Sequence, residues 1–366
     1  MLLPNKILMA RAGAVGVEKA SRKIAGLDSI RFLCATAVVQ YHMGLFELRA
    51  GSLRSVANFT AAILDNLFNG PAAVIVFFVI SGFCIHYPFR GGRPLVASSF
   101  YARRFIRIVP PALVFSLVLW GGLHDKSLLQ QTVLWSIVCE TIYYLIYPLL
   151  LYVQRRSSWL AIVACGYCCA IVWISTHLAD LRFGAFHAVS TQPYVVFGWA
   201  TWIVGLPCWL LGCWLAEAFT VFSSLPRWRL WLIRFAIYGV SILLGIVRFR
   251  FQSPWASDCV LLDLYAVPIF FWIGYEIAHY VKRAPWRVLE WGGSWSYSLY
   301  LVHPLAIPLL SAIGLTFVTK SLAMRIITSI IVFPASYGFY WVVERPSHRL
   351  AVVVARFFDK RVVSRT

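Results

Sequence analysis

The sequence predicts an all-α, polytopic integral membrane protein with about ten transmembrane helices. Of its 366 residues, 60% are hydrophobic and only 13% are charged, whereas a soluble domain has about 25% charged residues. The hydrophobic residues form solid runs of about twenty, the length at which a helix crosses a ~30 Å hydrocarbon core. Membrane β-strands would alternate apolar and polar residues instead. The composition therefore argues against a soluble enzyme, a disordered chain and a β-barrel.

Ten apolar segments are long enough to be assigned as spans within a single domain over residues 1–366. The third segment is short, and Pro304 and Pro308 interrupt the ninth. Trp and Tyr recur near the segment ends, as interfacial anchors do. The predicted spans are 29–48, 71–89, 106–122, 133–153, 158–176, 197–219, 229–247, 259–280, 295–317 and 324–343.

The distribution of basic residues orients these spans. The chain carries 33 Lys and Arg against 14 Asp and Glu, a net charge of +19. With ten spans both termini lie on one side, and 25 basic residues fall on that side against 8 on the other. Basic residues concentrate in cytoplasmic loops, so both termini are expected in the cytoplasm. The same rule accounts for the positive charge without a nucleic-acid partner.

The nine cysteines do not suggest a metal site. Cys165, Cys168 and Cys169 have a spacing that resembles a metal motif, but they lie within a hydrophobic helix. A zinc site of this kind needs a second ligand pair elsewhere in the chain. We expect no bound metal, and we interpret the cysteines as small apolar side chains.

Arg31 and His42 are ionisable residues within the first span. Eleven residues at 100° each bring both side chains onto one helix face, about 16 Å apart along the axis. Ionisable groups inside a span are candidates for function. The alternative is structural: Arg31 reaches the interface, and His42 makes a hydrogen bond between helices.

A second basic group precedes the third span. Arg103, Arg104 and Arg107 are followed by Pro110 and Pro111, which suggest a shaped loop. Arginines three apart bind phosphate oxygens through bidentate hydrogen bonds. The alternative, which is the commoner explanation for a basic loop, is ordinary cytoplasmic charge.

Two further polar residues lie deep in spans. Glu140 needs a basic or hydrogen-bonding partner there, and His42 is the predicted partner because both lie toward the outer half. Cys139 is a possible nucleophile, but it points to another face. His303 either satisfies backbone groups freed by Pro304 or acts in the site. Weaker candidates, nearer span ends, are Asp263, Glu217 and Glu344.

Taken together, these segments resemble the acyltransferase family 3 membrane proteins, in order along nearly the whole chain. The resemblance rests on six motifs: GLDSIRFLCATAVVQYH, VFFVISGFCI, FYARRFIRIVPP, WSIVCETIYYLIYPLLL, SYSLYLVHP and VVERPSHRL. The first resembles the family's Arg-x10-His helix, and the third resembles its Arg-x-x-Arg loop.

The resemblance implies an O-acyltransferase of a bacterial inner membrane. Its donor would be a cytoplasmic acyl-coenzyme A, usually acetyl-CoA, and its acceptor a glycan or lipid-linked saccharide such as O-antigen or exopolysaccharide. The implied catalytic residues are His42, Glu140 and Arg31. Coenzyme A would contact Arg103, Arg104 and Arg107. Further candidates are Ser81, Tyr300 and His303, the first two as oxyanion donors.

The implied mechanism requires a passage from the basic inner rim to His42. There His42 acts as general base on the acceptor hydroxyl or is itself acylated, and Glu140 orients it. Intramembrane His, Glu and Arg also form proton relays. A secondary transporter is therefore the alternative, although the two halves of the chain show no visible repeat. Neither the acceptor sugar nor the oligomeric state follows from the sequence.

Overall fold

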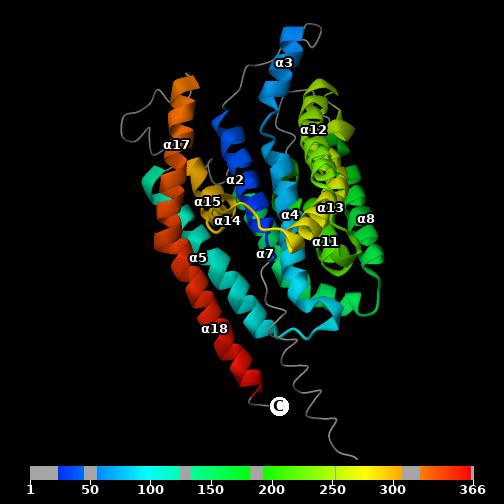
Figure 1. Ribbon diagram of the computed structural model, residues 1–366, viewed down its shortest axis with the longest axis vertical. Coiled ribbons are helices and arrows are strands. Elements are labelled where there is room, and N and C mark those ends of the chain that lie inside the picture. The colour runs from blue at the N-terminus through cyan, green and yellow to red at the C-terminus, as the bar shows by residue number, and fades with distance from the viewer. Residues whose placement is uncertain are drawn as a thin grey trace, which may run out of the picture.

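The computed structural model of the protein describes residues 24–44, 56–123, 133–181, 193–251, 253–306 and 322–363. Across these ranges the chain is helical and contains no β-strand, which confirms the predicted fold class. Two helices, α2 (Leu27–Met43) and α4 (Gly70–His86), lie at the centre (Figure 1). The helices that pack to one side of them are α7 (Leu134–Gln154), α8 (Trp159–Thr176), α11 (Thr201–Ala218), α12 (Arg227–Phe251) and α13 (Asp258–Lys282).

Helix α4 forms the core because it is apolar around its whole circumference. Asn69 caps its start by accepting a hydrogen bond from the Ala72 N–H at 3.0 Å, and Pro71 follows in the first turn, where no N–H is needed. Two glycines bring α4 against α11. A Cβ on Gly82 would lie 2.0 Å from the Trp209 carbonyl oxygen, and one on Gly212 would lie 2.0 Å from the Val79 oxygen. The two backbones therefore touch, as small residues allow in membrane bundles.

Seven helices are long and apolar enough to cross a membrane, among the described residues. They are Gly70–Gly92, Leu134–Gln154, Trp159–Thr176, Val195–Val221, Arg227–Arg248, Asp258–Lys282 and Arg325–Lys360. Helix α12 also exposes a large apolar face that includes Leu232, Phe235 and Leu243, which suits contact with lipid. A multi-pass membrane protein is thus supported. The predicted count of ten spans is not confirmed, since α2 has 17 residues and the helices of the predicted ninth span are shorter still.

Helix α5 (Ala97–Leu123) differs from its prediction as a short span after a shaped loop. The helix begins before the arginines and runs through Pro110 and Pro111 without ending. Arg103, Arg104 and Arg107 therefore lie on a helix, at 100° intervals, and not in a loop. Because the segment is a helix and not a loop, Arg103 and its neighbour Arg104 point in different directions.

The predicted ninth span is broken, as its prolines indicated. The short helix α14 (Arg287–Gly293) precedes this span, and the short helix α15 (Ser296–Val302) begins it. Both pack against α2, and α15 leads into a 3-10 turn at His303–Leu305. Proline at position 304 starts that turn, because it has no N–H to continue an α-helix. The remainder of the predicted span, including Pro308, lies outside the described residues.

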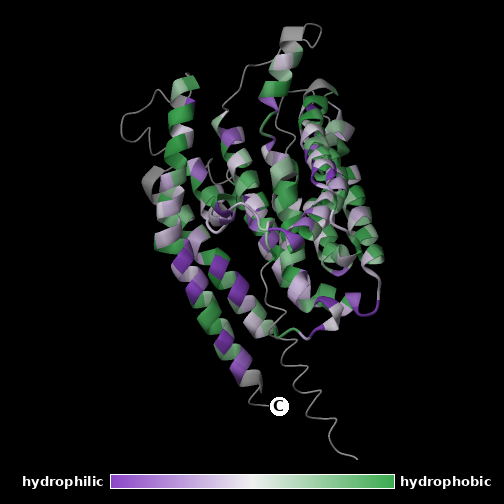
Figure 2. Ribbon diagram, viewed as in Figure 1, coloured by the Kyte–Doolittle hydropathy of each residue, from purple (hydrophilic) through white to green (hydrophobic). Residues whose placement is uncertain are grey.

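The predicted tenth span continues well beyond its expected end. Helix α17 (Leu322–Phe339) passes through a π-helical turn at Tyr340–Glu344 into α18 (Arg345–Val363). The wider turn comes directly before Pro346, which cannot donate the next helical hydrogen bond. Helix α18 runs beside the start of α5, and Figure 2 shows more hydrophilic residues there than in the centre of the bundle. An ion pair of 2.6 Å between Arg103 and Asp359 joins the two helices.

Candidate active site

A cavity lies between α2, α4, α5, α7 and α15. Its free volume is about 890 Å³, including its open mouth. Three arginines, one carboxylate and several hydroxyl groups line it together with apolar side chains. The lining residues are Arg31, Val74, Phe77, Phe78, Ser81, Cys84, Ile85, Arg104, Arg107, Ile108, Ser136, Ile137, Glu140, Tyr144, Ser296, Tyr297 and Tyr300.

Arg104 and Arg107 line the cavity, and Arg103 does not. The first two are three residues apart on α5 and share a face, whereas Arg103 points away and pairs with Asp359. Of the three arginines predicted to contact the donor, the structure brings two to this cavity and leaves Arg103 outside it. The buried Nε of Arg104 has no hydrogen-bond partner, and its guanidinium lies 5.9 Å from the centre of the Tyr144 ring. A buried, unpaired guanidinium N–H that lines a cavity is a donor for an anion.

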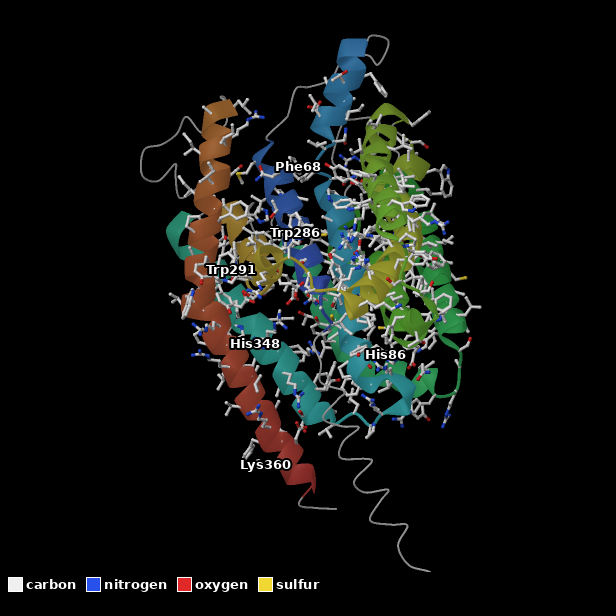
Figure 3. The ribbon with its side chains drawn as sticks, in the orientation of Figure 1. Phe68, His86, Trp286, Trp291, His348 and Lys360 are labelled. Carbon is white, nitrogen blue, oxygen red and sulfur yellow. The ribbon has the colours of Figure 1, made fainter. Side chains whose placement is uncertain are left out.

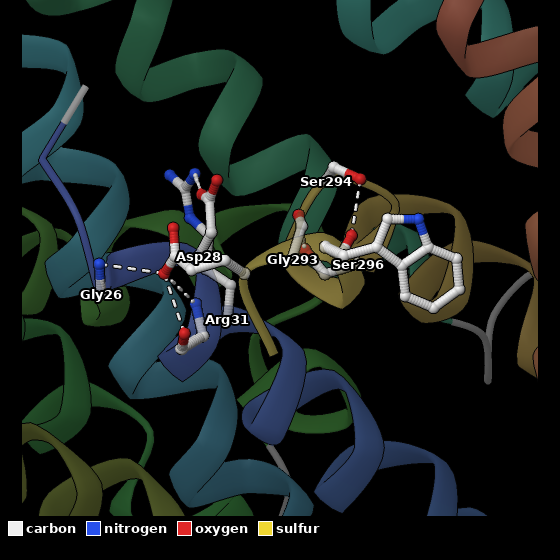
Figure 4. A network of polar contacts seen from close by, with 9 residues as sticks. Gly26, Asp28, Arg31, Gly293, Ser294 and Ser296 are labelled. Atoms are coloured by element: carbon white, nitrogen blue, oxygen red, sulfur yellow. Dashed lines mark hydrogen bonds and ion pairs between the residues drawn. The ribbon is translucent and has the colours of Figure 1, made fainter. Parts of the chain in front are cut away.

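Arg31 is held at this cavity by the first turn of α2 (Figure 4). Its Nη1 lies 3.3 Å from Asp28 Oδ1. The turn itself is fastened to α14, because Glu290 Oε1 accepts hydrogen bonds from the Gly26 N–H at 2.9 Å, the Ser29 N–H at 3.1 Å and the Ser29 hydroxyl at 2.8 Å. One carboxylate from a distant part of the sequence thus positions the helix that carries Arg31 and His42.

The close packing of α14 on α2 depends on Gly293. A Cβ at this position would lie 2.2 Å from the Asp28 carbonyl oxygen. The Gly293 carbonyl accepts a hydrogen bond from the Ser296 hydroxyl at 3.0 Å, which joins α14 to α15 (Figure 4). Helix α14 therefore positions both Arg31 and the first turn of α15 at the same cavity.

Glu140 does not contact His42, contrary to the prediction. Its Oε1 accepts short hydrogen bonds from the hydroxyls of Ser81 and Tyr144. The sequence indicated the depth of Glu140 in the membrane, but not the direction in which its helix turns the side chain. Ser81 also differs from its predicted role, because its hydroxyl donates to this carboxylate and not into the cavity. Tyr144 was missed, although it lies four residues after Glu140 on the same helix face.

Tyr300 forms the far end of the cavity. Its hydroxyl lies 2.7 Å from the Ser136 Oγ, and Ser136 in turn donates to the Val133 carbonyl at 2.9 Å. The Phe77 ring packs edge-on against Tyr300, with ring centres 5.5 Å apart. Ser136 was also missed by the sequence analysis, since a serine inside a span carries no charge to mark it.

His42 and His303 form a pair directly beyond Tyr300. The His303 Nε2 lies 3.2 Å from the His42 Nδ1, and the two ring centres are 4.9 Å apart. The His303 Nδ1 lies 2.8 Å from the Tyr300 carbonyl oxygen, and the His42 Nδ1 lies 2.9 Å from the Val38 oxygen. Carbonyl oxygens only accept, so each Nδ1 is assigned the proton. His303 Nε2 is then an acceptor, and His42 Nε2 keeps a free lone pair.

Among the residues that the structure describes, no continuous passage leads from the arginines to His42, contrary to the prediction. Neither histidine lines the cavity, whereas Tyr300 does, with its ring centre 6.2 Å from that of His303. His303 is fully buried and His42 is exposed. Tyr300 therefore separates an arginine-lined cavity from an imidazole that is reached from another direction.

The weaker candidate carboxylates have partners of their own. Glu217 accepts from His86 at 2.8 Å, and the other ring nitrogen of His86 lies 2.9 Å from the Tyr147 hydroxyl. Figure 3 places His86 near the lower end of α4, at about the level of His348 on α18. Glu344 Oε2 accepts from the N–H and hydroxyl of Ser298. These contacts join helices to one another, and they lie outside the cavity lining.

Comparison with known proteins agrees with these motifs. The family described as "Acyltransferase domain", acyltransferase family 3, matches residues 24–345. A relative in Bacillus subtilis (strain 168), named "Putative peptidoglycan O-acetyltransferase YrhL", is 23% identical over 397 aligned positions, which cover 93% of this chain and 57% of the relative. The chain thus spans little more than half the length of that relative. No solved structure gives a significant match. The family match extends over most of the chain and over every helix that lines the cavity, so this protein belongs to acyltransferase family 3.

Proposed function

We propose that the protein transfers an acyl group, in the first instance acetyl, from cytoplasmic acyl-CoA to a hydroxyl group of a cell-surface glycan. One observation carries the proposal. A cavity with three arginines ends at Tyr300, and the His42–His303 pair lies directly behind that residue. Only the Tyr300 side chain would therefore separate an anionic donor in the cavity from a basic imidazole.

The dimensions of the donor support this arrangement. Its phosphates would lie against Arg104, Arg107 and Arg31, whose guanidinium groups donate bidentate hydrogen bonds. A pantetheine arm extends about 15–20 Å by the reach of its covalent chain. Arg31 and His42 are separated by about 16 Å along α2. A thioester anchored by its phosphates at the arginines would therefore reach the level of Tyr300 and the histidines.

The chemistry follows from the free lone pair of His42. Its Nε2 takes the proton of the acceptor hydroxyl, whose oxygen attacks the thioester carbonyl carbon. The carbon–sulfur bond then breaks, and the proton passes to the sulfur, which leaves as coenzyme A thiol. His303 Nε2 accepts the Nδ1–H of His42 and holds the imidazole, the part that a carboxylate plays in a catalytic triad. Tyr300 must move aside during this step, and its hydroxyl or a nearby backbone N–H would stabilise the oxyanion.

The acceptor would approach from the exposed side of His42. We place the protein in a bacterial inner membrane, with both termini in the cytoplasm and the glycan on the opposite side. The name of the Bacillus relative makes peptidoglycan the first acceptor to test, followed by O-antigen and exopolysaccharide. Lipid-linked saccharide precursors are acceptors of the same chemical class.

Release of thiol tests the reaction directly. Purified protein in lipid nanodiscs is incubated with acetyl-CoA and a soluble peptidoglycan disaccharide, and free thiol and the ester product are quantified. We expect one ester per thiol released, and no release by the His42→Ala protein. Flux of a substrate driven by a proton gradient without thiol release would instead support a transporter. Mass spectrometry of the quenched enzyme tests whether His42 is acylated on the way.

Cys84 reports on occupation of the cavity independently of turnover. It lines the cavity, whereas Cys165 is exposed on α8. We expect coenzyme A to slow the alkylation of Cys84 by N-ethylmaleimide and to leave Cys165 unaffected, as mapped by peptide mass spectrometry. Equal alkylation of Cys84 with and without coenzyme A would contradict donor binding in this cavity.

A further inference from the structure

A second cavity lies beside the first, between the N-terminal halves of α4, α7, α11 and α13. Its free volume is about 460 Å³, including its open mouth. It is lined by Pro71, Ile75, Phe78, Trp135, Thr201, Val204, Gly205, Asp258, Cys259, Leu262 and Asp263. Phe78 belongs to the lining of both cavities.

Phe78 is a packed wall between the two cavities. Its side chain is 4% exposed, and its ring packs edge-on against Trp135 and Tyr143, with ring centres 6.3 and 5.7 Å apart. Gly205 leaves the space that this ring occupies, since a Cβ there would lie 2.9 Å from the ring. The neighbouring residue Phe77 packs against Tyr300 instead. Phe77 and Phe78 both line the donor cavity. Phe77 lies on the side of Tyr300 and the histidines, and Phe78 lies on the side of the second cavity.

The second cavity suits an uncharged alkyl chain. Pro71, Ile75, Val204 and Leu262 supply apolar walls, and burial of each methylene against such walls is favourable. Its two carboxyl groups are engaged: Asp258 pairs with Arg248 at 2.5 Å, and Asp263 accepts from the Cys208 thiol at 3.3 Å. An acyl chain ending in a carboxylate would lose its hydration in this cavity, and Arg248 is already paired with Asp258, so burying that charge is unfavourable.

We propose that Phe78 sets the length of the acyl group that the enzyme transfers, and that the cavity behind it is a latent site for a longer, uncharged acyl chain. The inference rests on the proposed function, which places the thioester at this end of the first cavity. With the ring in place, an acetyl group fits and the next methylenes meet the wall. The bonds exchanged remain the same, since the carbonyl carbon passes from sulfur to the acceptor oxygen and the proton from that oxygen to sulfur.

The test compares donors of different length. The wild-type, Phe78→Ala and Phe78→Leu proteins in nanodiscs are assayed with acetyl-, butanoyl- and succinyl-CoA, with thiol release and the mass of the ester as readouts. In Phe78→Ala we expect the ratio of kcat/KM for butanoyl over acetyl to rise at least about tenfold, because a pocket gains that much or more from each methylene it accommodates. Phe78→Leu should give a smaller rise. Succinyl use should stay at the wild-type level.

Two controls assign the effect to this cavity. Phe83 is a fully buried phenylalanine on the same helix that lines neither cavity, so Phe83→Ala should keep the wild-type ratio. Val204 lines only the second cavity, so adding Val204→Phe to Phe78→Ala should refill that cavity and restore the preference for acetyl.

Three results would overturn the inference. One is an unchanged ratio in Phe78→Ala and Phe78→Leu proteins that still transfer acetyl. Another is a butanoyl gain that persists after the cavity is refilled. The third is loss of all transfer in both Phe78 variants while they remain monodisperse. Phe78 would then be needed for transfer of any acyl group and would not select its length. A wild-type protein that transfers no acyl group overturns the proposed function itself, and this outcome is distinct from the other three.

Discussion

The His42 and His303 imidazoles face each other, with 3.2 Å between His42 Nδ1 and His303 Nε2. The Tyr300 carbonyl fixes the proton on the far nitrogen of His303, at 2.8 Å. His303 therefore presents a lone pair to His42, and His42 presents a lone pair on the side away from it. His303 thus occupies the position beside His42 that Glu140 was predicted to fill.

Replacement of His42 by alanine should abolish acyl transfer. The loss in kcat/KM should be at least about 10²- to 10⁴-fold, the contribution of a positioned general base. Thiol release from acetyl-CoA in the presence of acceptor measures the loss, and the thermal unfolding temperature in nanodiscs verifies folding. Transfer at the wild-type rate by a folded His42→Ala protein would remove His42 from the mechanism.

His303 should act on the rate and not on donor affinity. His303→Ala removes the acceptor for the His42 Nδ1–H, so we expect kcat to fall by about 10²-fold or more, as when a triad loses its orienting group. The KM for acetyl-CoA should stay within about threefold, because His303 does not line the donor cavity. His303→Asn, which keeps a hydrogen-bond acceptor, should recover part of the rate. A change confined to KM would contradict this role.

Arg104 and Arg103 form a matched pair for testing donor binding. Arg104→Gln should raise the KM for acetyl-CoA about tenfold or more, the cost of one charge-assisted hydrogen bond. Arg103→Gln should leave that KM unchanged, because Arg103 pairs with Asp359 on α18. Equal effects of the two substitutions would mean that both arginines supply only general positive charge.

Glu140→Gln distinguishes the observed site from the predicted one. Glutamine keeps an oxygen that can accept from Ser81 and Tyr144, and the carboxyl makes no contact with His42. We expect the pH dependence of kcat to remain that of the wild type. A pH profile displaced in the same direction in both Glu140→Gln and Glu140→Ala would show that the carboxylate acts on His42 after all.

Glu290 should contribute to stability through the first turn of α2. Glu290→Ala removes the acceptor of three hydrogen bonds, so we expect unfolding to become easier by about 1–3 kcal/mol. Thermal unfolding followed by the loss of monodisperse protein measures the change. Glu290→Gln should lose less, because its amide oxygen still accepts. An unchanged unfolding temperature in Glu290→Ala would show that α14 holds α2 by packing alone.

Residue patterns alone were enough to predict the helices and to single out the polar side chains within them. Hydrophobic runs predicted the helices, and the break at Pro304 was predicted from the missing N–H of proline. Arg31, Arg104, Arg107, Glu140 and Tyr300 were singled out, and all five line one cavity. Charge and aromaticity are costly or distinctive inside a membrane, so these residues can be recognised without a structure.

Only the tertiary structure decided which side chains meet. The partner of His42 is His303 and not Glu140, because the rotation of α7 about its axis directs Glu140 toward Ser81 and Tyr144. Arg103 separates from Arg104 because the expected loop is a helix, and neighbouring residues on a helix face different directions. A residue's position along a span follows from counting residues. Its rotation and its neighbours depend on how all the helices pack together, and no single segment carries that information.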